Sequence, residues 1–222
     1  MRTLVALLLL VLTRDGTLHR FDGHHDTTAK APQASAMAVV ANRTVVLAGG
    51  KLIVDGKALP GRFDDVRALA GGDELWALGR AGVSRVDLKT GTPTVALVDP
   101  QAHLLAADGA VAFSEHGGEI VQIGTSHIWK VTGRPIAMAA GDGKLYVATK
   151  EGPLFEIDRA RNSRRVLPLG DWWGTIALAW GDHALYAVTV AGKLWRIDPA
   201  RNEKTIVAMD GWQGAIDLAV LR

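Results

Sequence analysis

The most constraining feature of this chain is an internal repeat. Residues 136–158 align without a gap on residues 176–198, at a spacing of 40 residues. The match continues downstream, where Asn162 falls on Asn202, Trp172 on Trp212 and Gly174 on Gly214. A repeat of this period, built from short strands, is typical of solenoids and β-propellers. The repeat therefore restricts the fold class before any other property of the chain is considered.

Each repeat unit is predicted to form four strands. An inner strand of small apolar residues precedes a Gly-Asp or Asn turn and a Leu-aromatic-Val strand. A turn ending in Gly then leads to a strand ending in Ile-Asp, and a polar loop and a final apolar strand complete the unit. Glycine, Asn and Asp stand where hairpins require positive φ. Weaker copies place the six inner strands at residues 36–41, 66–70, 103–107, 136–140, 176–180 and 215–220. Division of 222 residues by six gives 37 per unit, which is enough for a four-stranded blade.

The two ends of the chain complement one another. The first unit begins at its second strand, and the last inner strand, residues 215–220, has nothing after it to pair with. Pairing of the C-terminal strand with the N-terminal segment would complete one blade and remove the exposed sheet edges of an open array. We therefore predict an all-β, six-bladed propeller of four-stranded antiparallel blades, formed as a single domain by residues 1–222.

The N-terminal segment has two interpretations. Residues 1–12 contain one basic residue and a long apolar run, as a signal peptide does. However, residues 13–22 match residues 189–198 position by position, so the apolar run falls where the repeat requires a strand. We interpret the run as a blade strand, with a targeting segment as the alternative. The first interpretation favours a cytoplasmic protein and the second a secreted one.

Composition excludes several classes of function. The chain has no cysteine, which rules out disulfides, thiolate metal sites and cysteine nucleophiles. Its net charge is +2, and the basic residues are scattered apart from a run at 159–165 that we interpret as a solvated hairpin loop. A nucleic-acid footprint needs a basic face, so we expect neither a nucleic-acid partner nor a membrane span.

The best repeats resemble a known family. The sequence Gly-x-Leu-x-Arg-Ile/Phe-Asp after Leu-Tyr-Ala-Val-Thr, with Trp-x-Gly before the next inner strand, resembles tectonin and tachylectin-type lectin propellers. Chromosome-condensation-regulator-type propellers share a similar pattern. The resemblance covers two and a half of six units, carried by residues 11–23, by 145–158 with Trp172 and Gly174, and by 185–198 with Trp212 and Gly214. It implies carbohydrate binding at loops between blades, without enzyme activity.

Catalytic and metal-binding constellations are sparse. The only polar residues on the predicted inner strands are Asp217, Arg67 and His103. A hard cation takes six or more oxygen ligands, and one carboxylate cannot supply them. The cluster His24-His25-Asp26 is best interpreted as a solvated loop, because adjacent strand residues face opposite sides. We therefore predict no catalytic residue, no metal and no cofactor.

The tryptophans offer the best candidate site. Trp76, Trp129, Trp180 and Trp195 fall within strands and are expected to pack between blades. The predicted ligand-binding residues lie in the connections that lead into the last two inner strands: Trp172, Trp173, Trp212, Asp171, Asp210 and Gln213. Aromatic faces stack on the apolar faces of sugars, and carboxylates accept hydrogen bonds from hydroxyls. The alternative is that Trp172 and Trp212 only fill the gaps between blades, which leaves Trp173 as the exposed ring.

The sequence thus favours a binding module over an enzyme. Its leading partner is a carbohydrate or glycoconjugate bound at inter-blade loops, and the alternative is a protein partner held by a propeller scaffold. A metal-dependent hydrolase or lyase is the third possibility, and it would need carboxylates or histidines directed into the central channel.

Overall fold

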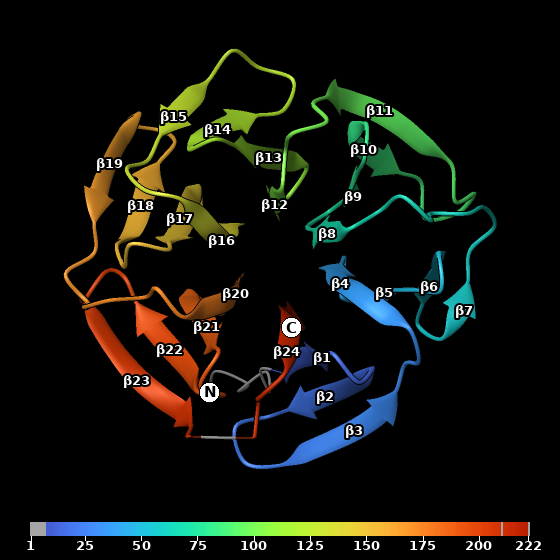
Figure 1. Cartoon of the computed structure of the whole chain (residues 1–222), viewed down its shortest axis with the longest axis horizontal. Coiled ribbons are helices and arrows are strands. Elements are labelled where there is room, and N and C mark those ends of the chain that lie inside the picture. Colours follow the sequence, from blue (N-terminus) through green and yellow to red (C-terminus); the bar gives the residue numbers. More distant parts are fainter. Residues whose placement is uncertain (1–7, 210, 222) are drawn as a thin grey trace, which may run out of the picture.

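The computed structural model describes residues 8–209 and 211–221, and within them every regular element is a β-strand. Twenty-four strands form six four-stranded antiparallel sheets arranged as blades around a central axis (Figure 1). The predicted all-β, six-bladed propeller is confirmed. Residues 1–7 of the apolar N-terminal run, and the candidate site residue Asp210, lie outside the described part of the chain.

The blades follow one another along the chain, each from inner to outer strand. Blade 1 contains β24 (Ala215–Leu221), β1 (Leu8–Thr13), β2 (Thr17–Phe21) and β3 (Asp26–Lys30). Blade 2 contains β4 (Ala34–Val40), β5 (Arg43–Ala48), β6 (Lys51–Val54) and β7 (Lys57–Ala58). Blade 3 contains β8 (Ala68–Gly71), β9 (Leu75–Gly79), β10 (Gly82–Val86) and β11 (Pro93–Val98).

The second half of the ring repeats this order. Blade 4 contains β12 (Leu104–Asp108), β13 (Val111–His116), β14 (Glu119–Gln122) and β15 (Ile128–Lys130). Blade 5 contains β16 (Pro135–Gly141), β17 (Lys144–Thr149), β18 (Leu154–Asp158) and β19 (Ser163–Val166). Blade 6 contains β20 (Thr175–Gly181), β21 (Ala184–Thr189), β22 (Leu194–Asp198) and β23 (Glu203–Ala208).

The ring closes through the two ends of the chain, as predicted. β24 pairs antiparallel with β1, with Leu8 opposite Leu221 and Leu12 opposite Asp217. In Figure 1 the red C-terminal strand lies beside the blue β1, and this pairing completes blade 1. A single blade thus combines strands from opposite ends of the sequence, so that no inner strand is left without its sheet.

The core consists of six apolar clusters, one between each pair of adjacent blades. β1 shows why. Leu9 and Val11 pack against blade 6, whereas the alternate residues Leu10 and Leu12 pack against blade 2. A strand between two blades buries both faces, so it is apolar at every position and not at every second one. This explains the continuous apolar run, at roughly 1.5–3 kcal/mol for each buried large side chain.

Turn chemistry follows the sequence pattern. The hairpin between β16 and β17 has Asp142 and Gly143 at φ 52° and 76°, and its repeat between β20 and β21 has Asp182 and His183 at 49° and 54°. Two successive residues at positive φ make the tight hairpin turn that suits the twist of paired strands. His183 is therefore a turn residue, at the position that Gly143 occupies in the preceding repeat.

Candidate functional site

The connections between blades and the turns between the second and third strands share one face of the ring, which we call the connection face. Backbone hydrogen bonds join the two kinds of segment. Trp172 donates its N–H to the carbonyl of Gly152 at 2.7 Å, and Val190 donates to Gly174 at 2.8 Å. In blade 1, the N–H of Arg14 reaches the carbonyl of Gly214 at 2.7 Å. These bonds place the predicted site residues on a face with a well-supported backbone.

Trp172 and Trp212 lie in the inter-blade core. Their exposed fractions are 3% and 4%. Trp172 packs edge-on against Trp195, with ring centroids 6.0 Å apart, between blades 5 and 6. Trp212 packs edge-on against Phe21 at 5.7 Å, between blades 6 and 1. Both rings fill the gap between blades, so neither presents a flat surface to solvent.

Trp173 differs from both, because 65% of its surface is exposed. It follows Trp172 in the connection from β19 to β20. Asp171, on the other side of Trp172, is also exposed and lies against the turn of blade 5, where a Cβ on Gly152 would stand 2.8 Å from its Oδ1. Trp173 is thus an exposed ring on a connection whose neighbouring residues are anchored.

Gln213 occupies the equivalent position in the next connection. It is exposed, its Oε1 accepts a hydrogen bond of 3.2 Å from the N–H of Gly211, and its side chain lies over Gly192. The structure therefore brings the candidate residues together in two groups. Asp171, Trp172 and Trp173 lie at the entry to blade 6, and Trp212 and Gln213 lie at the entry to blade 1. At equivalent positions, the second group has the amide of Gln213 and the first group has the indole of Trp173.

Sequence reasoning missed an acidic group in the core of blade 4. Glu115 is fully buried, its Oε1 accepts a 2.7 Å hydrogen bond from the N–H of Gly118, and its Oε2 lies 2.8 Å from Nε2 of His103. Burial raises the pKa of this carboxyl, and the bond from Gly118 and the nearby His103 oppose the shift. Aligning the second strands of the blades, Ala-Phe-Ser-Glu-His of residues 112–116 against Leu-Tyr-Val-Ala-Thr of residues 145–149, sets Glu115 against Ala148 and would have exposed the anomaly.

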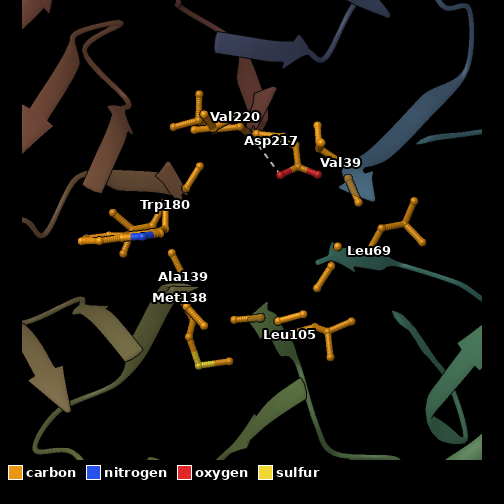
Figure 2. Close-up of a pocket in the computed structure, with 18 of the residues that line it drawn as sticks. Val39, Leu69, Leu105, Met138, Ala139, Trp180, Asp217 and Val220 are labelled. Carbon is orange, nitrogen blue, oxygen red and sulfur yellow. Dashed lines mark hydrogen bonds between the residues drawn. The ribbon is translucent and has the colours of Figure 1, made fainter. Parts of the chain in front are cut away.

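The three polar residues predicted on the inner strands have different environments. Arg67 and His103 each lie just before the inner strand of their blade. Arg67 donates a hydrogen bond from Nη2 to the carbonyl of Ala102, and Nε2 of His103 contacts the carboxylate of Glu115. Asp217 lines the central channel (Figure 2). Burial raises the pKa of Asp217 to about 7, opposed by hydrogen bonds from the backbone N–H groups of Met37 and Leu218.

The loop around His24 and His25 is solvated, as interpreted from the sequence. The carboxylate of Asp22 accepts hydrogen bonds from the backbone N–H groups of His24 and His25 at 2.9 and 2.8 Å. The His25 side chain is 82% exposed. Among the residues that the structure describes, no three His, Asp or Glu side chains are grouped so that they could hold a metal ion. None of the described elements is a helix long and apolar enough to cross a bilayer.

The fold and the site define the chain as a six-bladed β-propeller with a structured connection face. No protein-family model matches the sequence, and no curated protein matches it. A chain of the nidogen/laminin complex is similar in structure, with a TM-score of 0.74, 9% identity and coverage of 97% of this chain and 98% of that one.

Two bacterial proteins match less well. Apo AztD from Citrobacter koseri has a TM-score of 0.53 at 15% identity, covering 95% of this chain and 74% of that one. PorZ, a surface component of the type-IX secretion system of Porphyromonas gingivalis, has a TM-score of 0.51 at 17% identity, covering 89% of this chain and 32% of that one. At such identities the likeness shows the propeller fold alone. The predicted propeller fold is thus supported, and none of these three structures is named as a tectonin or tachylectin-type lectin.

Proposed function

We propose that this propeller is a binding module without catalytic activity, and that its connection face binds a carbohydrate at Trp173. The observation that carries the proposal is the 65% exposure of Trp173, whereas the adjacent Trp172 and its repeat equivalent in the next connection, Trp212, are buried. Trp is highly buried on average, and an exposed indole on a hydrogen-bonded backbone offers an apolar face on which a sugar ring can stack.

The connection holds the ring in a defined place. The residue before Trp173 donates its N–H to Gly152 at 2.7 Å, and Gly174 after it accepts the N–H of Val190 at 2.8 Å. Thr175 closes the segment with a bond of 2.9 Å to the carbonyl of Trp172. A ligand that stacks on a ring presented from such a backbone has little loop ordering to offset. Asp171 supplies exposed carboxylate oxygens that accept hydrogen bonds from hydroxyls.

A glycan array followed by titration calorimetry tests the proposal. Replacing Trp173 with Ala removes a stacking contact of about 1–2 kcal/mol, and we expect affinity for a saccharide found on the array to fall roughly tenfold. The matched control is Val95→Ala, which removes an exposed apolar side chain from β11 on another blade and should leave affinity unchanged. A folded Trp173→Ala protein that binds the saccharide as well as the parent contradicts this site.

A protein partner is the second candidate, because the exposed apolar surface extends beyond one ring. Val190, in the turn bonded to Gly174, is 58% exposed, and Met209, in the next connection, is 60% exposed. Exposed apolar surface marks protein interaction sites, and Trp is enriched among the residues that dominate binding energy at them. The similar propeller from the nidogen/laminin complex was solved in a complex between proteins.

Variants separate the two candidates. Val190→Asp places a charge in the apolar surface but removes no ring, so it should abolish binding of a protein partner and leave saccharide affinity within about twofold. Trp173→Ala weakens binding of either ligand. Pull-down with each variant against the parent chain, beside the array, therefore assigns the surface to one class: loss with both variants indicates a protein, and loss with Trp173→Ala alone indicates a saccharide.

A further inference from the structure

The outermost strand of each blade has a free edge. It is the last strand of its sheet, so it pairs on one side only, and its backbone N–H and C=O groups on the other side face away from the blade. Such an edge can pair with a strand of another chain. Proteins suppress this pairing with charged side chains on the edge strand or by keeping that strand short.

Five of the six outer strands have such protection. The two shortest, β7 and β15, have two and three residues and one lysine each. β3, β19 and β23 each carry two charged side chains. The charged residues of these five strands are Asp26, Lys30, Lys57, Lys130, Arg164, Arg165, Glu203 and Lys204.

β11, on blade 3, lacks this protection. Its six residues, Pro93–Val98, include no charged side chain, although the strand is as long as β23. Val95 and Val98 are exposed, and Leu97 is half-buried. Pro93 has no N–H to donate, and a register shift against β10 at Ala96 bends the strand. These two features shorten the stretch that can pair, and β23 combines a similar register shift with two charges.

A second copy of the chain is the occupant that fits this edge best. Alternating backbone donors and acceptors match an extended strand. Of the six outer strands that the structure describes, β11 is the one whose pairing with β11 sets no charged side chain against the apolar residues. An antiparallel pair of two β11 strands is self-complementary, as a two-fold interface requires. The net charge of +2 over 222 residues gives little repulsion between copies.

We propose that two copies of this chain associate through antiparallel pairing of their β11 strands, which joins two four-stranded blades into one continuous sheet. The paired stretch is short and the contact area is small, so the dimer is weak, with a Kd on the order of 0.1 mM. Blade 3 lies opposite blade 6 in the ring (Figure 1). The dimer therefore leaves Trp173, at the entry to blade 6, accessible.

Sedimentation velocity of the full chain measures the association. Between about 0.01 and 1 mM the average mass should rise from that of one chain towards that of two. Hydrogen exchange locates the contact: amides of residues 94–98 should exchange more slowly at the highest concentration than at the lowest, and those of β23 should not change. A chain that stays monomeric at 1 mM, or slowed exchange confined to another strand, overturns the proposal.

Charge variants at Ala96 test the pairing of two β11 strands. Ala96 is exposed and next to the middle of β11, so in a centred pair the side chains at this position from the two copies lie close together. Ala96→Lys and Ala96→Glu each set like charges against one another and should weaken self-association at least tenfold. An equal mixture of the two variants brings opposite charges together and should associate again.

The matched control is Thr205→Glu, at an exposed position in β23, which is as long as β11. It adds the same charge to another outer strand and should associate like the parent. Undiminished association of both folded Ala96 variants overturns the proposal. A mixture of them that stays monomeric also overturns it, because the two β11 strands then do not meet. If an Ala96 variant does not fold, hydrogen exchange in the parent chain decides.

Discussion

Glu115 of blade 4 occupies the position that Leu12 occupies in blade 1. The strand register places Leu12 opposite Asp217 on the inner strand of its blade and Glu115 opposite the equivalent residue, Leu104. Both side chains are fully buried. The other four blades have Leu47, Leu78, Ala148 and Val188 at this position. One blade of six therefore places a carboxyl where the inter-blade core is otherwise apolar.

Stability should depend on pH through this carboxyl. Because burial raises its pKa in the folded state, the contribution of Glu115 to stability is fully present below the ordinary carboxyl pKa. It is lost as pH rises through the raised value. Glu115→Gln keeps an acceptor for Gly118 and removes the titration, so its stability relative to the parent should grow between pH 4 and pH 8. Urea unfolding of both proteins across this range measures the difference.

Glu119 on the same blade provides a control of opposite sign. Its ion pair with Lys130, at 2.6 Å, lowers the pKa of its carboxyl. The contribution of Glu119 to the free energy of unfolding is therefore present above the ordinary carboxyl pKa and is lost as pH falls through the lowered pKa. Glu119→Gln should lose stability relative to the parent chiefly at neutral pH, by a small amount because the pair is exposed. Parallel pH profiles for the two variants would contradict the burial argument for Glu115.

Blade packing leads to a second prediction, at Gly141. A Cβ on Gly141, at the end of β16, would stand 1.8 Å from Cδ1 of Trp180 in the next blade. The indole of Trp180 stacks on the ring of Tyr146, with the ring centroids 5.0 Å apart. Gly141→Ala must displace the indole from this stack, and we expect a loss of about 1–3 kcal/mol in unfolding free energy. Gly143→Ala has nothing within 4 Å of its Cβ but sits at φ 76°, so it reports backbone strain alone, about 1 kcal/mol. Equal losses of unfolding free energy in Gly141→Ala and Gly143→Ala, measured by thermal unfolding, would show that the indole of Trp180 moves aside without cost.

The repeat predicts the architecture well because a propeller needs the same pattern in each blade. Spacing and turn residues such as Gly143 and Asn162 suffice to place the strands and the closure. The site is predicted less well for a physical reason. Trp172 and Trp173 are adjacent and chemically identical, yet one fills the core and the other faces solvent, and this depends on the position of each residue relative to the inter-blade gap.

Burial of charge was also not evident from the local sequence. Glu115 stands in a strand whose match to the repeat is weak, so its immediate neighbours do not distinguish it from an exposed strand residue, and only comparison with the second strands of the other blades does. β13 is enclosed because blades 3 and 5 pack against its two faces, as the core clusters that contain Ala112 and Phe113 show, so burial there depends on residues of other blades.

Ring closure yields a third prediction. Removal of residues 215–222 deletes β24, which pairs with β1 from Leu8 to Thr13 and contributes Leu218 and Val220 to the core between blades 6 and 1. We expect the truncated chain to unfold or aggregate, because β1 loses its neighbour and an apolar edge is exposed. Adding a peptide of residues 212–222 should restore soluble, cooperatively unfolding protein. A truncated chain whose thermal stability matches the parent rules out closure by this strand.

The two adjacent tryptophans give the sharpest test of how the connection face is built. Trp172 is 3% exposed and packs on Trp195, whereas Trp173 is 65% exposed. Trp172→Ala should therefore cost about 3–5 kcal/mol of unfolding free energy through the cavity it leaves, and Trp173→Ala should cost less than about 0.5 kcal/mol. Urea denaturation of each variant measures both values, and acrylamide quenching should lose its most accessible component only in Trp173→Ala. Similar losses of stability in the two variants would mean that Trp173 is packed in solution, and the connection face would then lack the exposed ring on which saccharide binding depends.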